Sequence, residues 1–129
     1  MKGDELKNRT REFAHRCVKL GMSLPNNQLG YHIRGQLFRC STSVASNYRA
    51  SCIAQSKASF ISKLSIVIEE ADESIFWLEF IIDEDLLKKP LVQPLMKEAE
   101  ELTAIFIASR KTARMKKDDY LKVSNPPKV

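Results

Sequence analysis

The sequence has few of the residues that interrupt helices. It contains 4 glycines and 5 prolines among 129 residues, too few to punctuate the many short strands of a β-sandwich or barrel. Hydrophobic residues make up 43% and charged residues 29%, which are ordinary values for a globular chain and exclude a disordered body. A chain of this length affords one sizeable hydrophobic core. The composition therefore predicts a single all-α domain.

Long hydrophobic runs are also missing. No run approaches the roughly 18 residues needed to cross a bilayer, and Met1–Arg11 is charged throughout rather than signal-like. We therefore expect a cytoplasmic protein that does not bind membranes. The three cysteines, Cys17, Cys40 and Cys52, form an odd set without a C-x-x-C pair. This pattern suggests neither a disulfide framework nor a zinc site, and we expect small, reduced core residues.

Acidic residues are absent from one quarter of the chain. Residues 25–56 carry three arginines and no acid, whereas residues 57–90 carry four bases and eight acids. The segments 1–24, 25–56, 57–90 and 91–129 have net charges of +3, +3, −4 and +3, which sum to +5. Such asymmetry indicates either that basic and acidic helices face each other or that a basic surface meets a polyanion. Composition does not separate these alternatives.

Hydrophobic and small residues recur every three or four positions in four segments. This spacing predicts helices over 4–22, 27–54, 57–86 and 91–117. Asp4 and Ser56 are candidate N-caps, and Pro94 is expected in a first turn, where proline is tolerated. The expected inward residues are Leu6, Thr10, Phe13, Cys17, Leu20, Leu24, Ile33, Leu37, Cys40, Val44, Asn47, Ser51, Ala54, Phe60, Leu64, Val67, Ala71, Ser74, Leu78, Ile81, Val92, Leu95, Ala99, Leu102, Phe106 and Ser109.

Four such segments joined by short links predict an antiparallel up-down-up-down four-helix bundle, roughly 40 Å long. The bundle is expected to span residues 1–117, followed by a flexible tail over 118–129. The small residues Cys40–Ser46 favour close approach of a neighbouring helix. Phe76, Trp77 and Phe80 form a second hydrophobic set on the third helix, which predicts a homo-oligomer interface there.

Motifs for catalysis or metal binding are not found. The one E-x-x-H pair, Glu12 and His15, points away from the expected core, so a di-metal centre of the bundle type is not predicted. The sequence has no G-x-S-x-G elbow and no glycine-rich phosphate loop. We therefore predict a non-enzymatic protein with no catalytic residue, no metal site and no cofactor.

Basic residues are the remaining functional candidates. In the second predicted helix, Arg34, Arg39 and Arg49 are interleaved with Tyr31 and Phe38, a combination that binds phosphate and stacks on bases in many proteins. The same arginines could instead pair with acidic residues of the third helix. A basic helix end follows in the fourth helix, where contact with a polyanion and simple solvation are equally open alternatives. Its residues are Arg110, Lys111, Arg114, Lys116 and Lys117.

Three stretches carry a family resemblance: Gln36–Asn47, Ser59–Ile66, and Glu70–Leu78 with its Phe76-Trp-Leu ending. Together with the Leu24-Pro25 turn and Gly30-Tyr31, they resemble the four-helix-bundle family encoded in 23S ribosomal RNA intervening sequences. The likeness spans roughly residues 6–110. Cys40 stands where many members have serine, a change that packing tolerates.

The resemblance implies a bundle assembled into a pentameric ring, as in the related accessory variability proteins of diversity-generating retroelements. Those relatives bind nucleic acid and a reverse transcriptase, so both are expected partner classes. The resemblance also implies that Arg39, Asn47 and Glu70 form a buried polar network between the second and third helices.

Two functions therefore remain open. The first is an oligomeric protein that binds structured RNA or DNA through repeated basic helix ends. The alternative is a protein–protein interaction scaffold or accessory subunit without nucleic-acid contact. A ligand-binding or metal-binding bundle is the weakest hypothesis, because inward polar residues are few.

Overall fold

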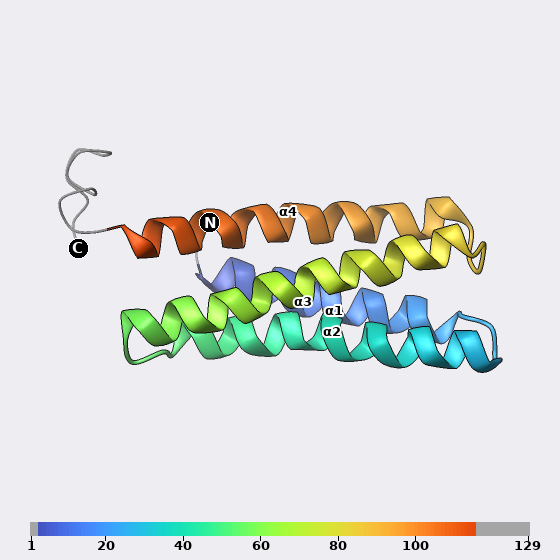
Figure 1. Cartoon of the computed structure of the whole chain (residues 1–129), viewed down its shortest axis with the longest axis horizontal. Helices are drawn as coiled ribbons and strands as arrows, with labels where there is room; N and C mark the ends of the chain where they lie inside the picture. The colour runs from blue at the N-terminus through green and yellow to red at the C-terminus, as the bar shows by residue number, and fades with distance from the viewer. Residues whose placement is uncertain (1–2, 116–129) are drawn as a thin grey trace.

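The computed structural model describes residues 3–115, and these residues form four long helices. They are α1 (Gly3–Met22), α2 (Gln28–Cys52), α3 (Lys57–Asp83) and α4 (Lys89–Arg114). Successive helices run in opposite directions, so that the predicted up-down-up-down bundle is confirmed (Figure 1).

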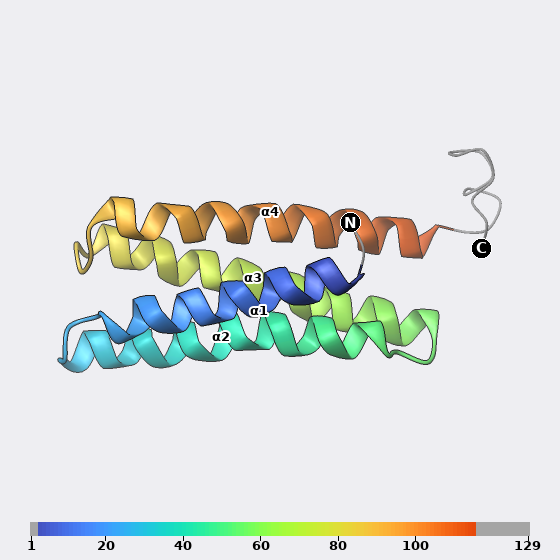
Figure 2. The ribbon, with the colours of Figure 1, turned by 180° about the vertical axis from the view of Figure 1, so that it is seen from behind.

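Each helix packs against two others, and diagonal helices do not approach closely. The pairs in contact are α1 with α2, α2 with α3, α3 with α4 and, most sparsely, α1 with α4. The α1–α2 and α3–α4 turns lie at one end of the bundle (Figures 1 and 2). Both ends of the described chain and the α2–α3 turn lie toward the other. Helix α1 lies along α2 near their shared turn and leans toward α4 at its N-terminus (Figure 2).

The core follows the periodic pattern closely. Nearly every residue expected to face inward is buried, including Phe13, Leu37, Leu64 and Phe106, each with no exposed surface. The remaining inward positions are partly exposed; they are Leu20, Asn47, Ala54, Phe60 and Ser109. Burial of the hydrophobic stripes supplies the main driving force for the bundle.

Two helix N-termini are capped by side chains, one of which was predicted from the sequence. The Asn27 carboxamide oxygen accepts a hydrogen bond from the Gly30 N–H at 2.8 Å. The Ser56 hydroxyl accepts one from the Ser59 N–H at 3.0 Å, which confirms Ser56 as the N-cap of α3. The expectation for Asp4 is wrong, because α1 already includes Gly3 and places Asp4 within its first turn.

The ends of α3 and α4 differ from the predicted ones. Helix α3 stops at Asp83, because Asp85 adopts a left-handed backbone with φ of 55°. The Leu86 N–H then bonds the Ile81 carbonyl at 3.0 Å, and the Asp85 N–H bonds that of Ile82 at 3.0 Å. These two bonds form a Schellman motif, which closes a helix.

Helix α4 begins at Lys89 rather than Leu91, with Pro90 in its first turn. Pro94 therefore lies inside the helix instead of in the first turn, which corrects the prediction. The helix ends at Arg114 rather than at residue 117. The predicted tail over 118–129 lies outside the described residues.

Two of the three cysteines are core residues, as expected. Cys17 and Cys40 are buried, and burial raises the pKa of the Cys40 thiol to about 11. The Ser74 hydroxyl donates a hydrogen bond to the Cys40 sulfur at 3.2 Å. The expectation for Cys52 is wrong, because this last residue of α2 lies on the outer side of the helix and is exposed. No helix within residues 3–115 is long and hydrophobic enough to span a membrane.

Candidate nucleic-acid and anion-binding surfaces

Arg39 pairs with two carboxylates of α3. Its NH1 lies 2.9 Å from a Glu70 carboxylate oxygen, and its NH2 donates to Glu73. The hydrogen bond to Glu73 raises the pKa of the Arg39 guanidinium. Glu73 also accepts a hydrogen bond from the Trp77 indole N–H at 3.2 Å. For Arg39 the structure therefore matches ion pairing between the second and third helices rather than a free cation.

The network implied by the family resemblance is realised only in part. Arg39 and Glu70 do connect α2 to α3, but half of the Arg39 side chain is exposed, so the network is not buried. Asn47 does not belong to it. The Asn47 amide donates instead to the carbonyl of Ser43 at 3.1 Å and to its hydroxyl at 2.8 Å, both one turn earlier in α2.

The Arg34 guanidinium donates hydrogen bonds to backbone carbonyls at the α1–α2 turn. Its Nε donates to the Gly21 carbonyl at 2.8 Å and its NH2 to the Leu24 carbonyl at 2.7 Å. The Gly21 carbonyl belongs to the last turn of α1, where backbone acceptors lack partners within the helix, and Leu24 lies in the turn that follows. Arg34 thus connects α2 to the α1–α2 turn, and its guanidinium, like that of Arg39, is engaged by other residues of the chain.

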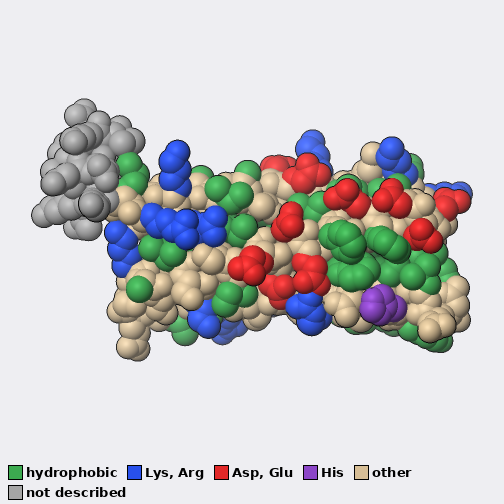
Figure 3. Space-filling model, in the orientation of Figure 1, with side chains coloured by type: hydrophobic (Ala, Val, Ile, Leu, Met, Phe, Trp, Pro, Cys, Tyr) green, Lys and Arg blue, Asp and Glu red, His purple; other side chains and the backbone are tan. Residues whose placement is uncertain are grey.

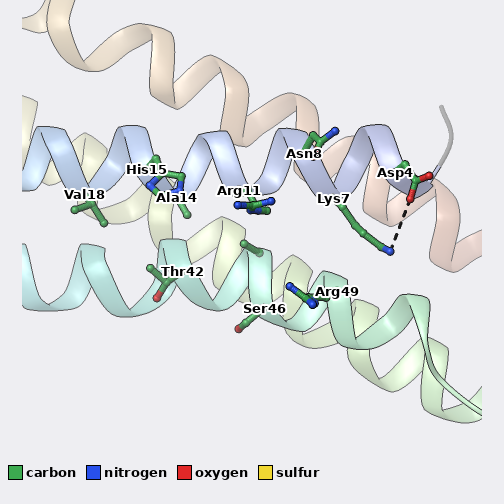
Figure 4. A pocket seen from close by; sticks show the side chains of 11 residues that line it. Asp4, Lys7, Asn8, Arg11, Ala14, His15, Val18, Thr42, Ser46 and Arg49 are labelled. Carbon is green, nitrogen blue, oxygen red and sulfur yellow. Dashed lines mark ion pairs between the residues drawn. The ribbon is translucent and has the colours of Figure 1, made fainter.

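Arg49 lies at a groove between α1 and α2 with a volume of about 940 Å³. Lys7 and Arg11 lie on the side of α1 that faces α2, and Arg49 lies on α2 (Figure 4). The groove is lined by Asp4, Lys7, Asn8, Arg11, Ala14, His15, Val18, Thr42, Ala45, Ser46 and Arg49.

The groove exists because α1 is inclined to α2. Near the α1–α2 turn the helices touch: a Cβ at Gly21 would lie 2.6 Å from the Phe38 ring. Toward its N-terminus α1 is held to α4 instead, since the Arg9 Nε donates to Glu98 at 3.0 Å and its NH2 lies 3.6 Å from Glu101. The small side chains facing the opening do not fill it.

Sequence reasoning missed Lys7 and Arg11 and assigned His15 to a solvated face. His15 is exposed, but it borders the groove. The spacing of these residues in the sequence does indicate a shared face: Lys7, Arg11 and His15 are four residues apart and therefore lie on one side of the helix. The face that α1 turns toward α2 depends on packing, which the spacing does not specify.

A second basic surface lies where α4 ends and α3 begins. We call Lys57, Arg110, Lys111 and Arg114 the cationic end. The Arg110 NH1 donates to the Ser65 hydroxyl at 3.2 Å, and the Lys57 ammonium donates to the Met115 carbonyl at 3.1 Å. None of the four forms an ion pair with a carboxylate of residues 3–115. Lys116 and Lys117, also predicted as binding residues, lie outside the described residues.

Charge is segregated along the visible face of the bundle. Basic side chains gather over the end of α4 and the start of α3, and acidic ones over the middle of the molecule and near the α3–α4 turn (Figure 3). A hydrophobic patch lies among the acidic side chains toward that turn.

Phe76, Trp77 and Phe80 form an aromatic cluster on α3. The ring centroid of Phe76 lies 4.9 Å from that of Trp77 and 5.9 Å from that of Phe80. Trp77 also packs edge-on against His32, with centroids 5.5 Å apart. Phe76 is 52% exposed, whereas Trp77 and Phe80 are partly buried against the core. Within a single chain Trp77 and Phe80 are therefore already partly buried, whereas helical periodicity placed all three aromatic residues on an uncovered face.

Within residues 3–115, no group of three or more His, Cys, Asp or Glu side chains is arranged to hold a metal ion. Glu12 and His15, the one E-x-x-H pair, are both exposed.

The chain is similar to proteins of one family. The model of the 23S rRNA-intervening sequence protein family matches residues 4–108. A solved structure from Bacteroides thetaiotaomicron, a protein of unknown function from the S23 ribosomal protein family, is 33% identical with a TM-score of 0.79. The match covers 86% of this chain and 99% of that chain. No curated protein sequence matches.

Proposed function

The chain belongs to the 23S rRNA-intervening sequence protein family, and from this premise we propose that it is a non-enzymatic, oligomeric, cytoplasmic protein that binds structured RNA or DNA. The observation that carries the proposal is the cationic end, whose four basic side chains form no ion pair with a described carboxylate. By contrast, Arg9 and Arg39 are engaged by glutamates of α4 and α3.

Cations at a helix end that form no ion pair with a carboxylate of residues 3–115 are suited to phosphate contact. Each phosphate neutralised by a lysine or arginine releases condensed counterions, so affinity falls steeply with salt. Such contacts fix position on the nucleic acid and carry little sequence information. In an oligomer, the cationic end is repeated, and several copies engage one nucleic acid with higher overall affinity. We therefore expect strong salt dependence and modest sequence preference.

Filter binding of labelled 23S ribosomal RNA fragments at several salt concentrations tests the proposal. Changing Arg110, Lys111 and Arg114 together to glutamate is expected to abolish binding. The single change Arg114→Gln is expected to weaken it and to reduce the slope of log K against log salt by about 1.

A matched control changes three exposed lysines to glutamate: Lys88, Lys89 and Lys97, which lie toward the opposite end of the bundle. This variant has the same net charge as the first triple variant, so a general effect of charge would weaken both equally. Equal loss in the two variants, or no binding by the unchanged protein at low salt, would overturn the proposal.

One observation favours the second candidate, a protein–protein scaffold. The aromatic cluster exposes Phe76 on an acidic helix, a surface suited to a second subunit or a basic protein partner. A pentameric ring and a reverse transcriptase are the assembly and partner that the related retroelement proteins suggest. This candidate replaces the first if RNA binding is absent while self-association persists.

A further inference from the structure

We propose that the α1–α2 groove binds a nucleotide, with the phosphate held by Lys7, Arg11 and Arg49 and the base placed over the small side chains of the groove. The volume of about 940 Å³ lies within the range of small-molecule sites. The site is separate from the cationic end, and the inference does not rest on the proposed nucleic-acid binding.

The part of the groove proposed to bind the phosphate, which we call the phosphate half, is lined by the cations Lys7, Arg11 and Arg49 from two facing helices. Arg11 comes from α1 and Arg49 from α2; both are exposed, and neither forms an ion pair with a carboxylate of residues 3–115. Lys7 lies 3.8 Å from Asp4, whose side chain is 93% exposed. An exposed pair of this kind contributes little to stability, so a phosphate can displace Asp4. Guanidinium groups bind phosphate oxygens through two parallel hydrogen bonds.

The fold places the three cations along the lining of one groove. Lys7 and Arg11 share one face of α1, about one helical turn or 6 Å apart. Arg49 reaches the same opening from α2, which runs antiparallel to α1 (Figure 4). Arg11 and Arg49 are like charges that line the same groove, so they repel each other. A phosphate dianion placed there removes this repulsion.

The part of the groove proposed to bind the base, which we call the base half, is lined mainly by small and hydrophobic side chains. Ala14, Val18 and Ala45 contribute hydrophobic surface next to the phosphate half. His15 adds an imidazole ring, a group on which bases stack in RNA-binding proteins. The Thr42 hydroxyl donates to the Phe38 carbonyl at 2.6 Å, which leaves its oxygen free to accept a hydrogen bond from a ribose hydroxyl or a base amino group.

Two ligands present a phosphate and an accessible base in this way: a free mononucleotide and a nucleotide within single-stranded RNA. A duplex does not present its bases in this way, because they remain stacked and paired. Isothermal titration of the whole protein with AMP, adenosine, inorganic phosphate and a single-stranded RNA trinucleotide separates these sources. Saturable binding of AMP is expected, with weaker binding of phosphate and of adenosine. A trinucleotide that binds more tightly than AMP identifies the strand as the source, and equal or weaker binding identifies the free nucleotide.

Charge variants test the phosphate half. Arg11→Gln and Arg49→Gln are each expected to raise the dissociation constant for AMP about tenfold, the effect of losing one charged hydrogen-bonding group. The control is Arg16→Gln, which removes the same charge from an exposed position of α1 outside the groove. Equal weakening by the control, or unchanged binding by Arg11→Gln and Arg49→Gln, would contradict the proposal.

A size variant tests the base half. Ala45→Leu fills the groove without changing charge and is expected to remove AMP binding while inorganic phosphate still binds. Circular dichroism confirms that each variant retains its helices. AMP that binds no better than phosphate, or Ala45→Leu that binds AMP normally, overturns the assignment of the base half. The triple glutamate variant of the cationic end is expected to keep AMP affinity, so failure of the RNA proposal and failure of this one are distinguished.

Discussion

At the scale of single residues, identical side chains perform different tasks according to their neighbours. Arg34 ties the α1–α2 turn through backbone carbonyls, Arg39 pairs with glutamates of α3, and Arg49 borders an open groove. All three belong to one helix and lie on different sides of it, but helical periodicity alone does not show which partner each side meets. What separates them is the partner that tertiary structure supplies: turn carbonyls for Arg34, glutamates of α3 for Arg39, and no carboxylate of residues 3–115 for Arg49.

Two glycines of α2 make a matched pair for mutation. A Cβ at Gly30 would lie 1.8 Å from the Pro25 carbonyl oxygen, whereas a Cβ at Gly35 would meet no atom within 4 Å. We expect Gly30→Ala to destabilise the protein by about 2 kcal/mol, because the turn must move. Gly35→Ala is expected to stabilise it by about 0.5–1 kcal/mol, because alanine favours the helix. Urea denaturation measures both, and changes of the same sign would refute the expectation.

At the scale of elements, the ends of the helices show where local chemistry and tertiary packing meet. The N-cap Ser56 was predicted from sequence, because its side chain bonds within its own first turn. Asn27, which was predicted as the first residue of its helix, caps α2 by the same local bond. The end of α3 is less readable. Its Schellman motif places Asp85 in a left-handed conformation that glycine adopts more readily.

The end of α3 gives a stabilising substitution. Asp85→Gly is expected to raise the free energy of unfolding by about 1 kcal/mol, because it relieves the left-handed backbone at φ of 55°. It also removes a negative charge from the negative end of the helix dipole. Asp85→Asn separates the two effects, since it removes the charge but keeps a side chain at the left-handed position. Thermal unfolding checks the order: glycine above asparagine above aspartate.

At the scale of the whole molecule, the bundle separates surfaces of different character. The cationic end lies where α4 finishes, the acidic side chains lie along α3, and the aromatic cluster lies toward the α3–α4 turn (Figure 3). This separation keeps the aromatic cluster, which we propose for self-association, apart from the surface proposed for nucleic acid.

Self-association is best tested through Phe76. Trp77 and Phe80 support the core of a single chain, so replacing them combines an interface effect with a folding effect. Phe76→Gln removes the ring that is 52% exposed and is expected to reduce the mass of the particle in sedimentation at micromolar concentration. The control is Ile53→Gln, at a 77% exposed position directly after the last residue of α2, and it is expected to leave the mass unchanged. An unchanged mass for Phe76→Gln would refute this interface.

The sequence by itself determined the helices, their order and nearly all of the core, because burial of a helix stripe depends on a spacing of three and four residues that local pattern displays. Residues such as Phe13, Leu64 and Phe106 were therefore assigned correctly. Tertiary structure alone decided the candidate groove. Its opening depends on the inclination of α1, set by contact at Gly21 and ion pairs from Arg9 to α4, and these interactions join residues far apart in the chain.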